Sequence, residues 1–447
     1  MKWRILRLTG VYLTAYCWIF SSVNELKGVF VVQKARNQDF QKRYNRALVL
    51  DTIRRSPQGI SRVALASSLA LKKSSITNIT GELIEQGVVI EAGQSLSPQK
   101  AGRKPVPLQL NGSFRHFLGV ELHPSMYRAS VTDLNGRQVY RTRGAIVTPE
   151  RGSDAGHFAR MTRSVVHTAL EEVARMGIEV AGIGIGIPGY IDSRNGYIIY
   201  SEPHNVRGFS FIEEVAVDFG VPVILENDAN CGAWGEVGHP FGSDVDNFLF
   251  ALGEFQDSSY APGQPPGLSL GFGLVINGRV YSGSSNSAGE FKSSRWRRGN
   301  HSQVSIPDER IARIHEDSEV FDEYLREVLS DISMLASVLD PERIVIGGDL
   351  SDRFERIREL LAGPMADSYL SEWPIHSFFT KARYGHDAVA AGAAAMVVED
   401  LFGGLIRHDG NRCSDLKWET LLDMPRSVLG REQNKTQELS VSDGQKE

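Results

Sequence analysis

Apolar side chains recur every three or four residues in three consecutive segments near the start of the chain, which is the period of an amphipathic helix. The pattern predicts helices over residues 45–55, 62–69 and 73–86. Ser61 precedes the second segment, where a hydroxyl can cap a helix, and Gly87 follows the third, where glycine commonly ends one. We expect Val63 and Leu65 to point inward from the second helix.

Two extended apolar runs follow the third helix. Residues 88–90 and 106–110 can pair as a hairpin around the polar loop 94–101. Helix, turn, helix and hairpin in this order are typical of a winged helix-turn-helix. We therefore expect a mainly helical domain of this kind at residues 45–111.

The third helix carries lysines and short polar side chains on its outer side, and a basic pair stands near the hairpin tip. Such groups suit the phosphates and base edges of DNA. The residues expected to bind DNA are Lys72, Lys73, Ser74, Ser75, Thr77, Asn78, Arg103 and Lys104, with Thr80 on the same face. The segment has nine Lys and Arg against four Asp and Glu, whereas the whole chain has net charge −5. The alternative is a small helical domain with a solvated polar face.

Beyond the hairpin, strands alternate with helices. A three-strand meander followed by alternating helices and strands occurs twice, which predicts two similar α/β lobes with a cleft between them. We expect the first lobe at residues 112–240, completed by a helix at 386–402, and the second at 241–385. Residues 209–219 are expected to be helical. Residues 403–447 lose the periodicity, and we expect them to be partly disordered.

Length and cysteine content fit an intracellular, multidomain protein. The chain has 447 residues, too many for one core. Its three cysteines, at positions 17, 231 and 413, have neither metal-site nor disulfide spacing, which favours the cytoplasm. Residues 1–44 contain a basic segment and a short apolar run that resemble a signal peptide. Because a DNA-binding pattern follows directly, we interpret them as an upstream extension; a membrane anchor is the alternative.

Five motifs link the chain to a known family. They are LGVELHPSMYRASVTDLNG, GIGIGIPGYID, VPVILENDANCGAWGE, FGLVINGRVYSGSSNSAGE and RIVIGGDL. Residues 45 to about 402 resemble the ROK family of repressors, open reading frames and sugar kinases, and more narrowly its xylose and N-acetylglucosamine repressor branch. The resemblance implies an actin/hexokinase-like (ribonuclease H-like) α/β fold of two lobes, with a sugar bound between them.

Four polar residues match sugar-contacting positions of that family, namely Asn205, Asn227, Asp228 and Glu290. A carboxylate accepts two hydroxyl hydrogen bonds, and an amide both donates and accepts. Asp228 matches the base of the family kinases, but we expect it to bind ligand only and expect no catalytic residue. The alternative is that Asn227 and Asp228 only cap the helix that follows them.

The resemblance fails at the phosphate loops. Residues 121–125 stand where family kinases have Asp, a hydrophobic residue, Gly, Gly and Thr, and Pro124 has no N–H to offer a phosphate. Residues 267–269 read Gly-Leu-Ser where Gly-Thr-Gly is usual. Ser293 stands where many members have a zinc-binding histidine, and no cysteine cluster follows. We therefore expect neither ATP nor metal, no cofactor and no enzyme activity.

These observations together predict a cytoplasmic, sugar-responsive transcriptional regulator, specifically a repressor. Its partners would be a double-stranded DNA operator, a sugar or sugar-phosphate effector, and further copies of itself in a homodimer or homotetramer, with no membrane contact. Two alternatives stay open. One is an ATP-dependent sugar kinase of the ROK type with degenerate phosphate loops, and the other is a regulator that answers to a protein partner.

Overall fold

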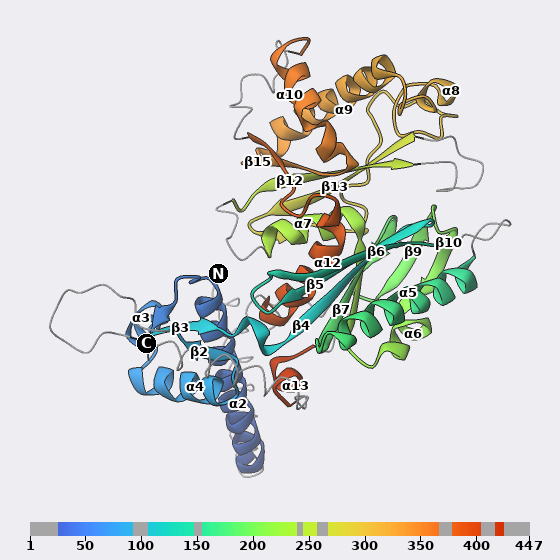
Figure 1. The fold of residues 1–447 in the computed structure, drawn as a ribbon. Coiled ribbons are helices and arrows are strands. Elements are labelled where there is room, and N and C mark those ends of the chain that lie inside the picture. The colour runs from blue at the N-terminus through green and yellow to red at the C-terminus, as the bar shows by residue number, and fades with distance from the viewer. Residues whose placement is uncertain are drawn as a thin grey trace, which may run out of the picture.

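The computed structural model describes residues 26–92, 106–146, 154–238, 245–256, 267–365, 378–403 and 416–423, with side chains described from residue 39 onward. A small N-terminal unit, a first lobe and a second lobe follow one another through the molecule (Figure 1). The predictions for the N-terminal extension up to residue 25, for Arg103 and Lys104, and for the tail beyond residue 423 lie outside the described residues. Within the described ranges, no helix is long and apolar enough to cross a membrane.

The N-terminal unit packs helices on a three-stranded sheet of order β1-β3-β2. It consists of α2 (Leu26–Arg54), β1 (Ile60–Ser61), α3 (Arg62–Ser68), α4 (Lys73–Glu85), β2 (Val89–Glu91) and β3 (Pro107–Leu110). Ser61 Oγ accepts the N–H of Ala64 at 3.2 Å, as expected of a cap. Gly87 has a φ of +73° and ends α4, which lets the N–H of Val88 donate to Leu83 O at 2.9 Å. The expected hairpin forms, because β2 and β3 pair antiparallel.

Three details of this unit differ from expectation. Val63 is 60% exposed, because in the seven-residue α3 only Leu65 and Ala66 reach the core. Thr80 is fully buried and donates to a carbonyl of its own helix at 2.8 Å, so it does not share the polar outer face. The first helix begins well before residue 45, since no proline interrupts the segment that precedes it.

Ala70 lies between α3 and α4 with a φ of +51°, in the left-handed region that favours glycine. We expect Ala70→Gly to stabilise the N-terminal unit by about 1 kcal/mol, since the left-handed conformation costs an alanine about 1–2 kcal/mol. Urea unfolding of the full chain measures this. The control is Ala64→Gly, at an exposed helical position, which should destabilise by about 0.5–1 kcal/mol. If both variants lose stability equally, the strain at Ala70 is refuted.

The first lobe is built on a sheet of order β11-β7-β4-β5-β6. Its strands are β4 (His116–Leu122), β5 (Met126–Asp133), β6 (Gln138–Ala145), β7 (Val180–Ile187) and β11 (Val223–Asn227). β4, β7 and β11 are parallel, while β5 and β6 extend the sheet antiparallel as the expected meander. α5 (Ala155–Arg175) packs Phe158 and Val166 into the core on one face of this sheet.

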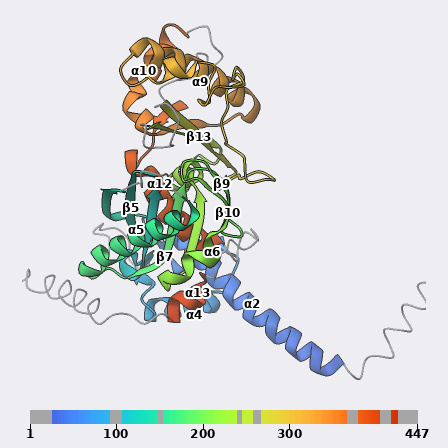
Figure 2. The same ribbon diagram turned by 90° about the vertical axis from the view of Figure 1, so that its right-hand side faces the viewer.

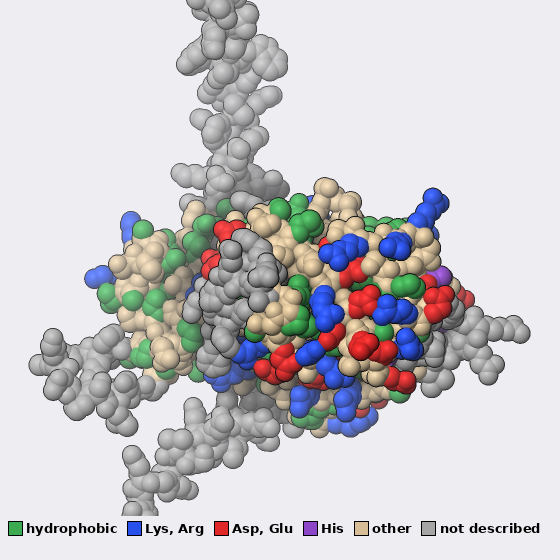
Figure 3. Space-filling view, turned by 90° about the horizontal axis from the view of Figure 1, so that it is seen from above, with side chains coloured by type: hydrophobic (Ala, Val, Ile, Leu, Met, Phe, Trp, Pro, Cys, Tyr) green, Lys and Arg blue, Asp and Glu red, His purple; other side chains and the backbone are tan. Residues whose placement is uncertain are grey.

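The second lobe repeats this plan with a sheet of order β14-β13-β12-β15-β16. Its strands are β12 (Phe248–Gln256), β13 (Gly267–Ile276), β14 (Arg279–Val280), β15 (Arg343–Gly348) and β16 (Phe379–Lys381). α9 (Ser318–Leu339) and α10 (Phe354–Ala362) cover one face. The outer surface of this lobe intersperses acidic and basic side chains (Figure 3), and Arg356 Nε donates to Asp322 Oδ1 there at 2.8 Å.

Two helices, α7 (Asp228–Val237) and α12 (Ala388–Gly403), lie between the two sheets (Figure 1). Their backbones touch: a Cβ added to Gly392 would lie 1.7 Å from Cys231 O. α12 meets the first sheet in the same way, since a Cβ on Gly184 would lie 2.0 Å from Ala393 O. Glycine is required at these points because any side chain would push the two backbones apart.

A small sheet of the first lobe was not predicted. Its strands are β8 (Tyr190–Asp192), β9 (Tyr197–Ser201) and β10 (Val206–Ser210). The expected helix over residues 209–219 is therefore wrong at its start, because Phe209 and Ser210 pair with Ile198 and Tyr197. The remaining short elements are α6 (Phe211–Glu214), α8 (Asp308–Ile311), α13 (Trp418–Asp423) and 3₁₀ helices at Gly112–Phe114, Ala216–Phe219, Asp349–Arg353 and Gly385–Asp387.

α13 and the C-terminal half of α12 join the N-terminal unit to the first lobe. Arg54 of α2 forms an ion pair with Glu399 of α12. Arg46 Nη2 of α2 lies 3.2 Å from Glu419 Oε1 of α13, and Trp418 is buried at the same joint. Figure 2 shows α2 projecting away from the lobes beyond this joint.

Candidate ligand-binding cleft

A cavity of about 580 Å³ is lined by residues of both lobes. Asn227 and Asp228 line it from the junction of β11 and α7 in the first lobe. Glu254 of β12 and Glu290, which follows β14, line it from the second. The structure thus brings together three of the four residues expected to bind the effector. A cavity of this size with convergent polar groups suits a small polar ligand.

The buried strand β11 ends at Asn227 and delivers both polar residues to the N-terminus of α7. Asn227 Oδ1 accepts the N–H of Asn230 at 3.1 Å, and its amide donates to Gly189 O at 3.0 Å. Asp228 Oδ1 accepts the N–H of Ala229 at 2.8 Å. Asn227 is therefore a helix cap, as the alternative interpretation held, and it also lines the cavity.

Two acidic side chains of the cavity, Asp228 and Glu290, have raised pKa values. Burial raises the pKa of Asp228 to about 7, and the nearby charge of Glu254 adds to the shift. Desolvation by the surrounding protein also raises the pKa of Glu290. Near neutral pH the Asp228 carboxyl is thus present in both forms, so it can accept a hydrogen bond from a ligand hydroxyl or, when protonated, donate one.

Asn205 does not join the other expected residues. It is exposed in the turn between β9 and β10, with a φ of +49°. The residues of this turn that line the cavity are Glu202 and Pro203. A motif match can identify such a loop, but it cannot give the direction of each side chain around a left-handed turn.

Several cavity residues were not anticipated. Tyr190 and Tyr200 come from the unpredicted sheet, and Lys292 and His301 come from the segment after β14. Lys292 Nζ lies 4.0 Å from the centroid of the Trp296 ring, which fixes its direction. The tyrosines occur in short strands without a clear period, so the sequence pattern had no means of placing them beside Asp228.

Hydrogen bonds hold the segment after Glu290, where many ROK-family members carry zinc ligands. Ser294 Oγ donates to Asp331 Oδ1 at 2.6 Å, and Ser305 Oγ donates to Glu327 Oε2 at 2.5 Å, both acceptors lying on α9. Gln303 Nε2 donates to a carbonyl of β13 at 2.8 Å. These hydrogen bonds attach the segment to α9 and β13 through protein side chains. The expectation that it binds no zinc stays a prediction.

α4 presents most of the residues expected to bind DNA at its N-terminal turns. Exposed side chains there are Lys72, Lys73, Ser74, Thr77 and Asn78, and Ser75 is half-buried. Thr77 Oγ1 donates to Lys73 O at 2.9 Å, which orients this hydroxyl along the helix. The polar face is therefore open to solvent on a helix whose other side is buried by Ile76 and Leu83.

Comparisons with known proteins match part of the chain to a family and to named regulators. Residues 118–292 match the ROK family. The chain is 28% identical over 254 residues to the xylose repressor of Caldicellulosiruptor bescii, which covers 57% of this chain and 59% of that protein. It is 26% identical over 254 residues to the DNA-binding transcriptional dual regulator NagC of Escherichia coli, covering 57% and 58%. The chain thus spans about three fifths of the length of these relatives.

A solved structure extends the likeness to the fold. The crystal structure of a ROK family transcriptional regulator, a homologue of the Escherichia coli MLC protein, matches with a TM-score of 0.60 at 22% identity. The match covers 82% of this chain and 98% of that structure. The chain therefore shares the fold of that regulator, in agreement with the ROK fold that the family resemblance implied.

Proposed function

Because this chain carries a ROK-family domain, we propose that it is a sugar-responsive, DNA-binding transcriptional regulator that acts as a repressor in the cytoplasm. The observation that carries the proposal is the attachment of a helical unit with an exposed polar helix to lobes whose cleft gathers hydroxyl-binding side chains. The names of the xylose repressor and NagC support the same function.

The N-terminal unit would bind the operator as a winged helix-turn-helix. α3 and α4 meet across the left-handed Ala70, and the β2–β3 hairpin follows, which is the order that places a recognition helix in the major groove. α4 would make the base contacts, with Lys72 and Lys73 near phosphates. One such module buries little DNA surface, so a homodimer or homotetramer would read an operator with two-fold symmetry.

The cleft would bind the sugar. Asp228 and Glu290 would supply carboxylates for ligand hydroxyls, and Tyr190 and Tyr200 line the same cavity with aromatic side chains. Lys292 adds a cation that suits a phosphorylated form. The effector is therefore a sugar or a sugar phosphate, and Asn227 would orient it by holding the start of α7.

We propose further that the protein is not a kinase. In the segment that resembles a phosphate loop, the ring of His123 contacts Glu254 of the second lobe at 2.8 Å, and Pro124 offers no N–H. Ser269 Oγ, in the second degenerate loop, donates to Glu254 O at 3.2 Å. One observation favours the alternative of a sugar kinase: a pKa of about 7 suits Asp228 as a general base.

Isothermal titration of the full chain tests these proposals. Xylose, N-acetylglucosamine and their phosphorylated forms are titrated in turn, followed by ATP with Mg²⁺. The expected result is heat from a sugar and none from ATP, and that sugar should then change the binding of operator DNA. Binding of ATP with turnover would establish the kinase instead. Silence from every sugar would support a regulator that answers to a protein partner.

The lysines of α4 provide a test of DNA binding that needs no knowledge of the operator. We expect Lys72→Ala with Lys73→Ala to reduce the slope of log affinity against log salt by about 1 for each phosphate that the lysines neutralise. Fluorescence anisotropy with a random-sequence duplex measures the slope. Arg175→Ala on α5 is the control, since Arg175 lies on the first lobe and should leave the slope unchanged. Equal slopes in all variants would exclude this face of α4 from the interface.

A further inference from the structure

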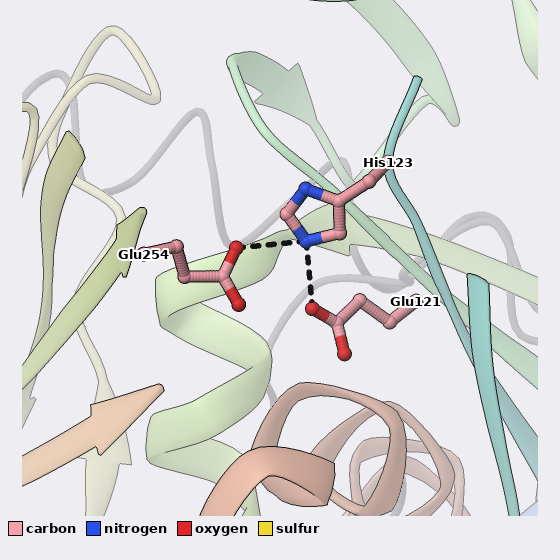
Figure 4. A group of neighbouring side chains, drawn as sticks. All are labelled: Glu121, His123 and Glu254. Carbon is pink, nitrogen blue, oxygen red and sulfur yellow. Dashed lines mark hydrogen bonds and ion pairs between the residues drawn. The ribbon is translucent and has the colours of Figure 1, made fainter. Parts of the chain in front are cut away.

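Three buried charged side chains and one half-buried arginine meet where the two lobes approach each other. Glu121 and His123 come from β4 and the residues directly after it, Arg128 comes from β5, and Glu254 comes from β12 of the second lobe. Figure 4 shows the ring of His123 between the two glutamates. Glu121 is fully buried, and His123 and Glu254 are each 5% exposed.

The contacts cross between the lobes. His123 Nε2 lies 2.8 Å from Glu121 Oε1 and 2.8 Å from Glu254 Oε2. Arg128 Nη1 lies 2.8 Å from Glu121 Oε1 and 3.3 Å from Glu254 Oε1. Glu254 is thus paired with two basic side chains of the other lobe, and Glu121 of that lobe contacts both of them.

The pKa shifts of His123 and Glu254 support an ion pair between these two side chains. Burial alone would lower the pKa of His123, but the two glutamates outweigh it and raise this pKa well above its usual value. Burial would likewise raise the pKa of Glu254, but His123 and Arg128 lower it to about 2. Glu254 is therefore an anion facing cations across the lobe boundary.

We propose that Glu121, His123, Arg128 and Glu254 form an ion-pair latch that holds the two lobes closed over the cleft. Buried ion pairs add little net stability, but removing one partner strands the others without compensation. The latch restrains lobe opening, because the contacts of Glu254 with His123 and Arg128 join the two lobes and opening would break both of them. Glu254 also lines the cavity, so the latch sets how easily a ligand enters and leaves.

The rival for the same residues is a metal site. Glu121, His123 and Glu254 each offer a ligand atom, and these atoms lie within 4.8 Å of one another. The geometry favours the latch, because Arg128 already contacts both carboxylates. Its positive charge therefore takes the role that a metal ion would have between them. The experiment distinguishes the two.

Distances between spin labels on the two lobes measure the latch without sugar or DNA, so the outcome is independent of the proposed function. Labels are placed at Val217 in the first lobe and Val338 in the second, which are 66% and 76% exposed. Cys17 and Cys413 are first replaced by serine, while Cys231 is buried and is kept. Electron–electron resonance then gives the distribution of inter-lobe distances in the full chain.

We expect Glu254→Gln to increase the population at altered, open distances by about tenfold or more. Asp322→Asn is the matched control, because Asp322 pairs with Arg356 inside the second lobe and should leave the distances unchanged. Arg128→Lys keeps the charge, but the lysine side chain is one bond shorter and its Nζ cannot take the place of Nη1 between the two carboxylates. A smaller shift in the same direction is therefore expected, and this variant provides a test even if Glu254→Gln fails to fold.

Two results would overturn the latch. In the first, the spin-label distances in Glu254→Gln and Arg128→Lys equal those in the chain without these substitutions. In the second, Mn²⁺ or Zn²⁺ binds the otherwise unaltered chain in a one-to-one ratio and Glu254→Gln abolishes this binding, which would assign the same residues to a metal ion.

Discussion

Gly392→Ala is expected to destabilise the lobes by about 3 kcal/mol or more, the largest effect we anticipate from a single methyl group. The added Cβ would lie 1.7 Å from Cys231 O, a backbone atom of α7 that cannot rotate away. α7 and α12 would have to separate, and overpacking of this kind typically costs about 1–3 kcal/mol even where side chains can adjust. Urea unfolding of the full chain, followed by circular dichroism, measures the change.

Gly156→Ala is the matched control for this prediction. Gly156 is also helical, in α5 of the first lobe, and a Cβ there would meet only the flexible end of Arg160 at 3.4 Å and Asp154 Oδ1 at 3.4 Å. We expect it to stabilise by about 0.5–1 kcal/mol. If Gly392→Ala were as stable as the control, the backbone contact between α7 and α12 would be refuted.

Asp228→Asn is expected to weaken effector binding by about 10–100-fold. Hydrogen bonds to a charged group contribute about 1.5–3 kcal/mol. A carboxylate accepts hydrogen bonds at both oxygens, whereas the amide of asparagine accepts only at its single oxygen and donates from its nitrogen. Titration with whichever sugar binds the unaltered chain measures the loss. Asp218→Asn serves as the control, because Asp218 pairs with Arg163 on the surface of the first lobe and should not affect binding. Equal affinities would remove Asp228 from the site.

The same residue predicts a pH dependence of sugar binding. Burial raises the pKa of Asp228 to about 7, so its carboxyl loses charge as the pH falls through that value. A sugar that needs the carboxylate as acceptor therefore binds more weakly as pH falls, approaching tenfold per pH unit well below 7. Asp228→Asn should flatten most of this slope. An affinity that rises on acidification would mean that protonated Asp228 donates the critical hydrogen bond.

Long periodic segments and buried strands made most of the fold predictable from sequence. The strand VAGIGIGI and the helix around Phe158 were placed correctly because hydrophobicity alone decides them. β8, β9 and β10 were missed because they are short and half-exposed, so no clear alternation of apolar and polar side chains marks them. Thr80 was assigned to the wrong face because its hydroxyl donates a hydrogen bond to a carbonyl of its own helix. The side chain can then be buried in the core.

The cleft was predictable only in part for a related reason. Asn227 and Asp228 could be located because both lie where β11 ends and α7 begins. Their position therefore does not depend on how the two lobes pack together. Glu254 could not be paired with His123, since that contact joins residues 131 positions apart in different sheets. Asn205 could not be placed in the lining of the cavity from the motif, because side-chain direction in a turn depends on a backbone conformation that the motif does not reveal.

The contact of backbone on backbone along α12 has a mechanical consequence. Interfaces made of long side chains can absorb a small displacement by changing rotamers, but Gly184, Gly392 and their neighbours have no rotamers to change. α12 must therefore move with α7 as a stiff rod of 16 residues, about 24 Å in length. Asp228 begins α7, and Glu399 of α12 grips Arg54 near the far end of this rod. A shift of Asp228 would therefore be passed to the N-terminal unit by movement of whole helices rather than by changes of side-chain rotamers.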